Sequence, residues 1–340
     1  MTSGPFPAPR GPLSTNLLAR LRGAPGGGPW RLDAVEGADP WGEDLQLALY
    51  AAFELRYRGI DGVDPAWEAD PGLFAVTTAM GERFLDAVRQ VVGPAEVTGP
   101  AATVEALTAA ATGGGPSLSR WVAEWGTLEH LREFAVHRSA YQLKEADPHS
   151  LALPRLPAGR AKAAFVQIQS DEYGNGRPGQ SHQELFAATL RALDLDDRYG
   201  AYVDLLPGPT LATVNLVTLL GTSRALVGAC VGHLALFEMT SVEPMGRYAR
   251  AVRRLTGHDA AARFYDVHVV ADQLHQRAAL DDLVVPFVED DPARAADVVF
   301  GARALAAVEA RFTAHLLRGW ARGRTSLRAP LDGRRAPAAA

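Results

Sequence analysis

Apolar residues recur at helical spacing through most of this sequence, and that pattern limits the possible folds more than any other feature. In the segments 44–59, 72–93 and 104–112, apolar side chains return every three or four positions, which places them on one face of a helix. No two segments of alternating polarity are joined by a hairpin turn, so an antiparallel sheet has no support. We therefore expect an all-α fold: a helical bundle with an N-terminal helical subdomain.

Segments rich in glycine and proline interrupt this helical pattern. The clearest is ATGGGPS at 111–117, because glycine and proline break helices. A long helix should follow it, opened by Pro116 and Ser117 and continuing to Glu145. Further helices are expected at 181–194, 209–240, 244–255, 258–280 and 292–320.

The same segments divide the chain into regions. The first thirty residues and the C-terminal APLDGRRAPAAA are rich in proline, glycine and alanine, a composition typical of tails. Only the stretch 14–23 has a helical pattern among the first thirty. We predict a poorly ordered tail over 1–30, a helical N-terminal region over 31–115, a main domain over 116–325 and a disordered tail over 326–340.

Charge and cysteine content exclude several classes of protein. The chain has 34 basic and 39 acidic residues, a formal charge of -5, and so lacks the basic field that binds nucleic acid or an anionic membrane. Cys230 is the only cysteine, which rules out a disulfide framework and suits the cytoplasm, where we expect the protein. The N-terminus has no apolar signal segment and no run of about eighteen apolar residues occurs, so neither export nor membrane insertion is expected.

Common catalytic motifs are missing from the sequence. The triple glycines at 26–28 and 113–115 precede no GK[ST]. No GxSxG or HExxH motif occurs, and no GxGxxG follows a predicted strand. Hydrolase, nucleotide-hydrolysing and dinucleotide-binding functions therefore have no support.

The segment DVHVVADQLH, 266–275, is the strongest candidate for a metal site. Its offsets of four and three residues place His268, Asp272 and His275 on one stripe of a helix. The alternative is an amphipathic helix whose polar stripe faces water. The apolar surroundings favour a metal site.

Two further segments carry candidate ligands. One is an apolar helical run, and the other is interrupted by glycine and proline. Glu238 lies in the apolar run GACVGHLALFEMTS, where a charge needs a metal, an arginine or a hydrogen bond to His233. Glu172 and His182 are separated by glycine and proline, which is also the composition of a surface loop. In an unbroken helix they would lie about 15 Å apart, so they can share an ion only if the segment unwinds or folds back.

Glu145, at the end of the long helix, looks like an exposed charge when taken alone. Together with the other candidates, however, it completes a set of four carboxylates and three histidines from four helical segments. That set suits a dinuclear metal site in a helical bundle. Oxygen and nitrogen ligands without sulfur favour iron or manganese over structural zinc.

The ordered set resembles a known family, the haem-oxygenase-like non-haem diiron proteins, also called iron-containing redox enzymes. It is most similar to the N-oxygenating branch, which includes the central N-oxygenase domain of a nitrosourea-forming enzyme. The resemblance runs from about Trp121 to Trp320. It is carried by the ordered ligands and by the sequence segments around them, KEADPH, QSDEYGNG and GHLALFEMTS. It implies a haem-oxygenase-like bundle and seven metal ligands: Glu145, Glu172, His182, Glu238, His268, Asp272 and His275.

The resemblance also implies cofactors and partners. The site would hold two Fe2+ ions and use O2 as co-substrate, with electrons from an external donor. Glu172 would be the additional carboxylate that marks N-oxygenases, and no catalytic residue beyond the ligands is implied. The N-terminal region resembles one that pairs subunits, so a homodimer is expected.

Three functions remain open from the sequence. The first is N-oxygenation of a small amine, guanidine or aminoazole in natural-product biosynthesis. The second is a diiron oxidase that performs desaturation or C–C cleavage of an amino acid or fatty acid, and the third is a helical binding protein without catalysis. The substrate is not determined, because a helix-face aromatic such as Tyr141 is more often part of the core than of a pocket.

Overall fold

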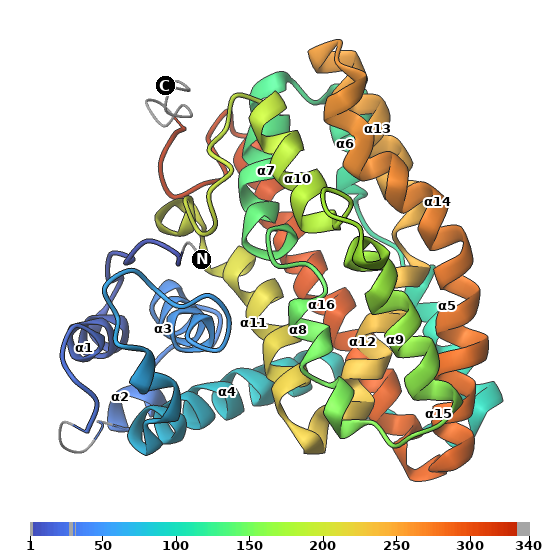
Figure 1. The fold of residues 1–340 in the computed structure, drawn as a ribbon, viewed down its shortest axis with the longest axis horizontal. Helices are drawn as coiled ribbons and strands as arrows, with labels where there is room; N and C mark the ends of the chain where they lie inside the picture. The colour runs from blue at the N-terminus through green and yellow to red at the C-terminus, as the bar shows by residue number, and fades with distance from the viewer. Residues whose placement is uncertain (1–2, 27–29, 31, 332–340) are drawn as a thin grey trace.

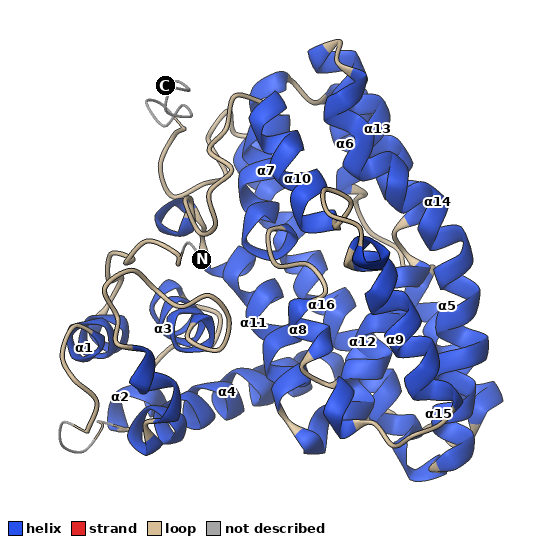
Figure 2. Ribbon diagram, in the orientation of Figure 1, coloured by secondary structure: helices blue, strands red, loops and turns tan. Residues whose placement is uncertain are grey.

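The computed structural model describes residues 3–26, 30 and 32–331 and is built from helices (Figure 2). Among these residues no β-strand forms, and a single isolated bridge pairs Gly4 with Ile60. The prediction of an all-α fold is therefore confirmed. The helices of the N-terminal third are α1 (Pro12–Leu21), α2 (Asp33–Glu36), α3 (Glu43–Glu54), α4 (Pro71–Val92) and α5 (Pro100–Ala111).

The remaining helices form the main bundle. They are α6 (Leu118–Trp125), α7 (Leu128–Gln142), α8 (Asp147–Ser150), α9 (Arg160–Glu172), α10 (His182–Ala192), α11 (Gly208–Thr222), α12 (Val227–Met239), α13 (Val242–Thr256), α14 (Arg263–Arg277), α15 (Val285–Asp290) and α16 (Ala295–Trp320). In Figure 1, α1 to α3 group beside this bundle and α4 runs from them towards it.

The N-terminal segment differs from the expectation of a poorly ordered tail. Helix α1 buries Leu17 and Leu21 against α3. Its first turn is capped from α3, because the carboxylate of Asp44 accepts hydrogen bonds from the backbone amides of Leu13 (2.9 Å) and Ser14 (2.7 Å). Packing and a cap supplied by a distant helix are the physical reasons, and neither is visible in the local composition.

At the other end of the chain, part of the predicted C-terminal tail is also structured. Ser326 is buried, and its hydroxyl and backbone amide both donate to Glu133. Residues 332–340 of that predicted tail lie outside the described residues. The expected boundary at 111–117 falls in the loop between α5 and α6, and the division into domains stays a prediction.

Two of the expected long helices are each broken into two. The helix predicted from 117 to 145 is interrupted at Gly126, and Thr127 caps a new helix by accepting from the backbone amide of His130. The helix predicted over 209–240 bends by 105° near Ser223. Each break lets apolar residues on both sides enter the same core.

The bent pair formed by residues 208–222 and 224–239 is a long apolar segment of the chain. Within the described part of the chain, no single helix combines the length and apolar character needed to cross a membrane, whereas this pair meets that criterion jointly. Both of its helices are largely buried in the bundle.

Helices α12 and α16 form the central contact of the bundle, through glycine. A methyl group on Gly232 would lie 1.8 Å from the carbonyl oxygen of Val298, and one on Gly301 would lie 1.8 Å from that of Ala229. The two backbones therefore approach each other too closely for any side chain at these positions. This contact fixes α12, which carries Glu238, against the C-terminal helix.

We predict that Gly232→Ala lowers the free energy of unfolding by about 3 kcal/mol, since overpacking a close contact costs about 1–3 kcal/mol or more. Urea unfolding followed by circular dichroism measures the change. Gly114→Ala is the matched control, because a methyl group there meets no atom within 4 Å. Equal stability of the two variants would contradict the close helix contact.

Candidate metal centre

Helix α14 turns its polar stripe towards the interior. His268, Asp272 and His275 are 3%, 1% and 4% exposed, whereas Val270 and Leu274 on the opposite face are 70% and 73% exposed. This is the reverse of an ordinary amphipathic helix. The alternative of a solvent-facing polar stripe is therefore wrong, and the buried polar side chains require partners.

The chain folds back between Glu172 and His182. Helix α9 ends at Glu172, the short turn η3 (Gly174–Gly176) reverses direction, and α10 begins at His182. Gly174 has φ 71°, and a methyl group there would lie 2.6 Å from the carbonyl carbon of Gln180, so glycine is needed at this reversal. As a result, His182 Nδ1 and Glu172 Oε2 lie 2.6 Å apart.

Glu145 lies in a turn and not in a helix. Helix α7 ends at Gln142, and Glu145 is only 2% exposed, so taken alone it was wrongly expected to be an exposed helical charge. The next residue, Ala146, has φ 73°, a left-handed conformation that costs an alanine about 1–2 kcal/mol. The surrounding structure must hold this turn in place.

Glu238, near the end of α12, is 4% exposed. Its Oε2 lies 3.2 Å from His275 Nδ1. The predicted alternative, a bond to His233, is not what the structure has, because His233 Nδ1 lies 3.0 Å from His149 Nε2. Glu238 therefore joins the same cluster as α14.

The seven predicted residues come together as two adjoining groups. Within each group one candidate ligand atom per residue lies within 4.8 Å of the others. Glu172 belongs to both, and a carboxylate has two oxygens with which to face two ions. His268 and His275 fall in different groups. The first group is Glu145, Glu172, His182 and His268, and the second is Glu172, Glu238, Asp272 and His275.

Several buried atoms of this cluster have no hydrogen-bond partner among the described residues. They are Glu172 Oε2 and His182 Nδ1, which lie 2.6 Å apart but without hydrogen-bond geometry, His268 Nε2, and both carboxylate oxygens of Asp272. Buried polar atoms are nearly always paired, and carboxylate oxygens and unprotonated ring nitrogens can only accept. A set of acceptors that face one another fits bound cations, so these residues suit a metal pair.

Outer contacts orient two of the imidazoles. His268 Nδ1 lies 2.8 Å from the carbonyl oxygen of Phe264, which can only accept, so Nδ1 carries the proton and Nε2 faces the cluster. His275 Nε2 lies 2.9 Å from Asp171 Oδ2, which leaves Nδ1 towards Glu238 and Asp272. Such contacts fix the ring orientation of metal-binding histidines. Sequence reasoning missed Asp171, although it precedes Glu172.

Without a bound cation, the carboxylates and imidazoles of the cluster share protons. Burial raises the pKa of Glu172 to about 7 and that of Glu238 to about 8. Burial lowers the pKa of His268, but Glu145 and the other carboxylates outweigh it and raise the value to about 10. For His275, Asp272 and Glu238 likewise outweigh burial and raise the pKa to about 11.

A small cavity adjoins both groups. Its volume is about 10 Å³, room for about one water-sized molecule. Its wall away from the cluster consists of Tyr141, His149, Gln169, Leu234, Phe237 and Ser241. Sequence reasoning did not select these residues, because aromatic and small polar side chains on helices carry no local signal of a cavity.

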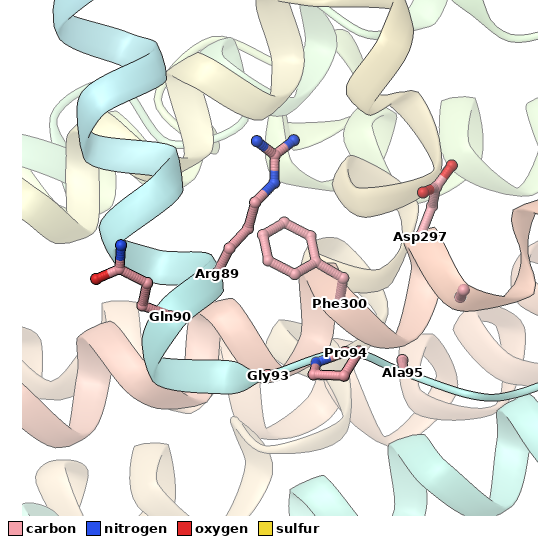
Figure 3. A pocket seen from close by; sticks show the side chains of 8 residues that line it. Arg89, Gln90, Gly93, Pro94, Ala95, Asp297 and Phe300 are labelled. Atoms are coloured by element: carbon pink, nitrogen blue, oxygen red, sulfur yellow. The ribbon is translucent and has the colours of Figure 1, made fainter.

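A larger pocket lies elsewhere, between α4 and α16 (Figure 3). Its volume is about 490 Å³, and Arg89, Asp297 and Phe300 are among its lining residues. None of the seven clustered residues lines it, and its side chains carry no imidazole or thiol. The chemistry of the chain is therefore concentrated at the smaller cavity.

The family model described as iron-containing redox enzyme matches residues 132–310, more than half of the chain. This span includes all seven clustered residues and the helices that carry them. The chain therefore belongs to the iron-containing redox enzyme family and is an oxidoreductase.

Among curated proteins, the chain is similar to the nitrosourea synthase of Streptomyces achromogenes subsp. streptozoticus. The two are 28% identical over 131 residues, which cover 38% of this chain and 28% of that protein. The likeness thus concerns a part of each chain.

We predict that Asp171→Asn weakens metal binding at the group containing His275 by about 10–100-fold, because an outer hydrogen bond to a ligating histidine is lost. Isothermal titration with Co2+ measures the affinity. Asp282→Asn, a change at an exposed carboxylate on η7 (Ala278–Val284), is the control. An unchanged affinity in the Asp171 variant would contradict the assigned orientation of His275.

We also predict that metal binding releases protons and strengthens as pH rises from about 6 to 9. His268 and His275 have pKa values raised to about 10 and 11 in the metal-free protein, and Glu238 to about 8. These groups therefore hold protons near pH 7 that a cation must displace. Titrations in buffers of different ionisation enthalpy count the protons. A metal affinity that does not change with pH would contradict the conclusion that these side chains hold protons in the metal-free protein.

Proposed function

We propose that this chain is a non-haem diiron oxygenase that uses O2 to oxidise a nitrogen atom of a small amine, guanidine or aminoazole in natural-product biosynthesis. The observation that carries the proposal is the position of Glu172, which belongs to both four-residue groups. A carboxylate between two ligand sets is the arrangement that holds two metal ions close together.

The donor set supports iron as the metal. Four carboxylates and three imidazoles, without sulfur, suit iron or manganese, and the family is one of iron-containing redox enzymes. The first ion would be held by Glu145, His182 and His268 and the second by Glu238, Asp272 and His275, with Glu172 shared. Two ferrous ions there would supply electrons for the reduction of O2.

The chain's own residues protect and orient this chemistry. The cluster is almost fully buried, and Leu234 and Phe237 close the cavity from the side of α12, so water is largely excluded. His268 and His275 are fixed by Phe264 and Asp171, so the ligand atoms require little rearrangement when a cation enters.

The wall of this small cavity opposite the cluster carries no charge, so a substrate nitrogen that reached the cluster would meet neutral side chains there. Burial raises the pKa of Tyr141 well above its usual value and lowers that of His149 to about 3, so both side chains are neutral near pH 7. A nitrogen must present an unprotonated lone pair to accept oxygen. A wall without positive or negative charge gives a cationic form of the substrate no partner on that side.

Glu172, the additional carboxylate, favours nitrogen oxidation over C–H abstraction. By resemblance, Glu172 is the additional carboxylate of the N-oxygenating branch. The name of nitrosourea synthase states that it forms a nitrosourea, a compound with an oxidised nitrogen, and this supports the same chemistry here.

Two further parts of the proposal concern partners. The electrons would come from a separate donor, because the single cysteine, Cys230, is buried and cannot form a disulfide within the chain. The chain would form a homodimer through its N-terminal region, as the resemblance implies.

The test is a reaction of the iron-loaded, reduced protein with 18O2 across a library of amines, guanidines and aminoazoles, read by mass spectrometry. We predict a product with 18O on nitrogen, and at least about a hundredfold less of it from Glu172→Ala, because one shared ligand is lost. Glu289→Ala, at an exposed glutamate of α15, is the control and should match the wild type.

Other outcomes separate the remaining functions. A product that has lost two hydrogens, with Glu172→Ala still active, would contradict N-oxygenation and favour the diiron oxidase. Fewer than about one iron per chain after loading under reducing conditions would contradict both enzymes and favour a binding protein.

A further inference from the structure

Among the seven clustered residues, Glu145 is the one that no helix holds. The other six lie within α9, α10, α12 and α14, which fix side chains more firmly than a turn does. Glu145 sits in the turn 143–146, whose last residue, Ala146, is left-handed. An anchor for this turn must come from elsewhere in the structure.

A buried ion pair anchors the turn to the N-terminal region. Lys144 is 1% exposed, and its ammonium donates to Glu54 at the end of α3, itself 3% exposed. Tyr199 donates to the other carboxylate oxygen of Glu54. Both charges are thus compensated away from water, a condition for burying them.

Aromatic rings complete the surroundings of this ammonium. Lys144 Nζ lies 4.9 Å from the ring centre of Tyr50 and 4.5 Å from that of Tyr57, within the range of cation–π attraction. Lys144 and Lys162 are the only lysines in the sequence, whose other basic residues are arginines. A compact ammonium suits this cage, whereas a planar guanidinium requires more room.

A second set of contacts reaches the same turn from the surface. Arg58 Nη2 donates to the carbonyl oxygen of Leu143 (3.2 Å) and to Gln183 Oε1 (2.7 Å). Gln183 Nε2 donates in turn to the carbonyl oxygen of Glu145 (2.8 Å). The turn is therefore tied both to the N-terminal region and to the start of α10, where His182 lies.

We propose that Lys144 and Glu54 are positioning residues for Glu145, so that the N-terminal helical region is a structural part of the first four-residue group. Neighbouring side chains of the turn point to opposite partners: Lys144 to α3 and Glu145 to the cluster. This inference rests on the proposed function, because it treats the cluster as two metal sites. The second group has no contact of this kind with α3 among the described residues.

The experiment is an anaerobic Co2+ titration of the full-length apoprotein, followed by absorption and calorimetry. The double variant Glu54→Leu/Lys144→Met replaces the ion pair by apolar side chains, a change that often preserves stability. We expect the wild type to bind two ions. The variant should bind one ion with the wild-type affinity and spectrum and the other at least about tenfold more weakly.

Two controls separate positioning from folding. Arg138→Met/Glu309→Leu removes a bidentate pair between α7 and α16 that contacts none of the seven residues, and it should retain both ions. Glu54→Gln keeps one acceptor oxygen for Lys144 and gives Tyr199 an amide NH2 from which its hydroxyl can accept. This variant should therefore fold and bind the weaker ion more tightly than the double variant does.

The outcomes distinguish this inference from the proposed function. Two ions bound with wild-type affinity by the double variant would overturn the positioning role and leave the diiron proposal standing. Equal weakening of both ions in Glu54→Gln would also overturn it, because that is the effect of general destabilisation. Fewer than two ions bound by the wild type would overturn the proposed function and this inference with it.

Discussion

The structure depends on one electrostatic constraint: four carboxylates and three imidazoles are buried within a few ångströms of one another. Burial of such groups is costly unless charges are compensated. In the protein without cations, the imidazoles of His268 and His275 hold protons that partly neutralise the carboxylates. Five buried polar atoms, among them both oxygens of Asp272, still lack a hydrogen-bond partner in the described chain. A bound cation would displace these protons and give all five atoms a partner.

The rest of the fold presents these groups from several directions. The glycine contact between α12 and α16 sets the depth of Glu238, and the reversal at Gly174 returns the chain so that His182 meets Glu172. Helix α14 contributes three residues by turning its polar stripe inward. The turn that carries Glu145 is held by Lys144 and Glu54, so the N-terminal region and the bundle share one set of constraints.

Much of this arrangement could be predicted from local patterns, and some of it could not. Helical periodicity was sufficient for the all-α fold, and residue spacing on α14 was sufficient to select His268, Asp272 and His275. The helical pattern at 14–23 indicated α1, but its start at Pro12 and its packing were not predicted, because Asp44 caps that helix from a distant position. Likewise, the cavity residues His149 and Gln169 and the outer partner Asp171 depend on contacts between helices, which no single segment encodes.

The central claim is that the cluster holds two metal ions with Glu172 between them. The most direct measurement is anomalous diffraction at the iron absorption edge from crystals grown anaerobically with ferrous iron. The account predicts two peaks per chain, one beside Glu145, His182 and His268 and the other beside Glu238, Asp272 and His275, with the Glu172 carboxylate facing both. A single peak, or a pair of peaks on the same side of Glu172, would contradict it.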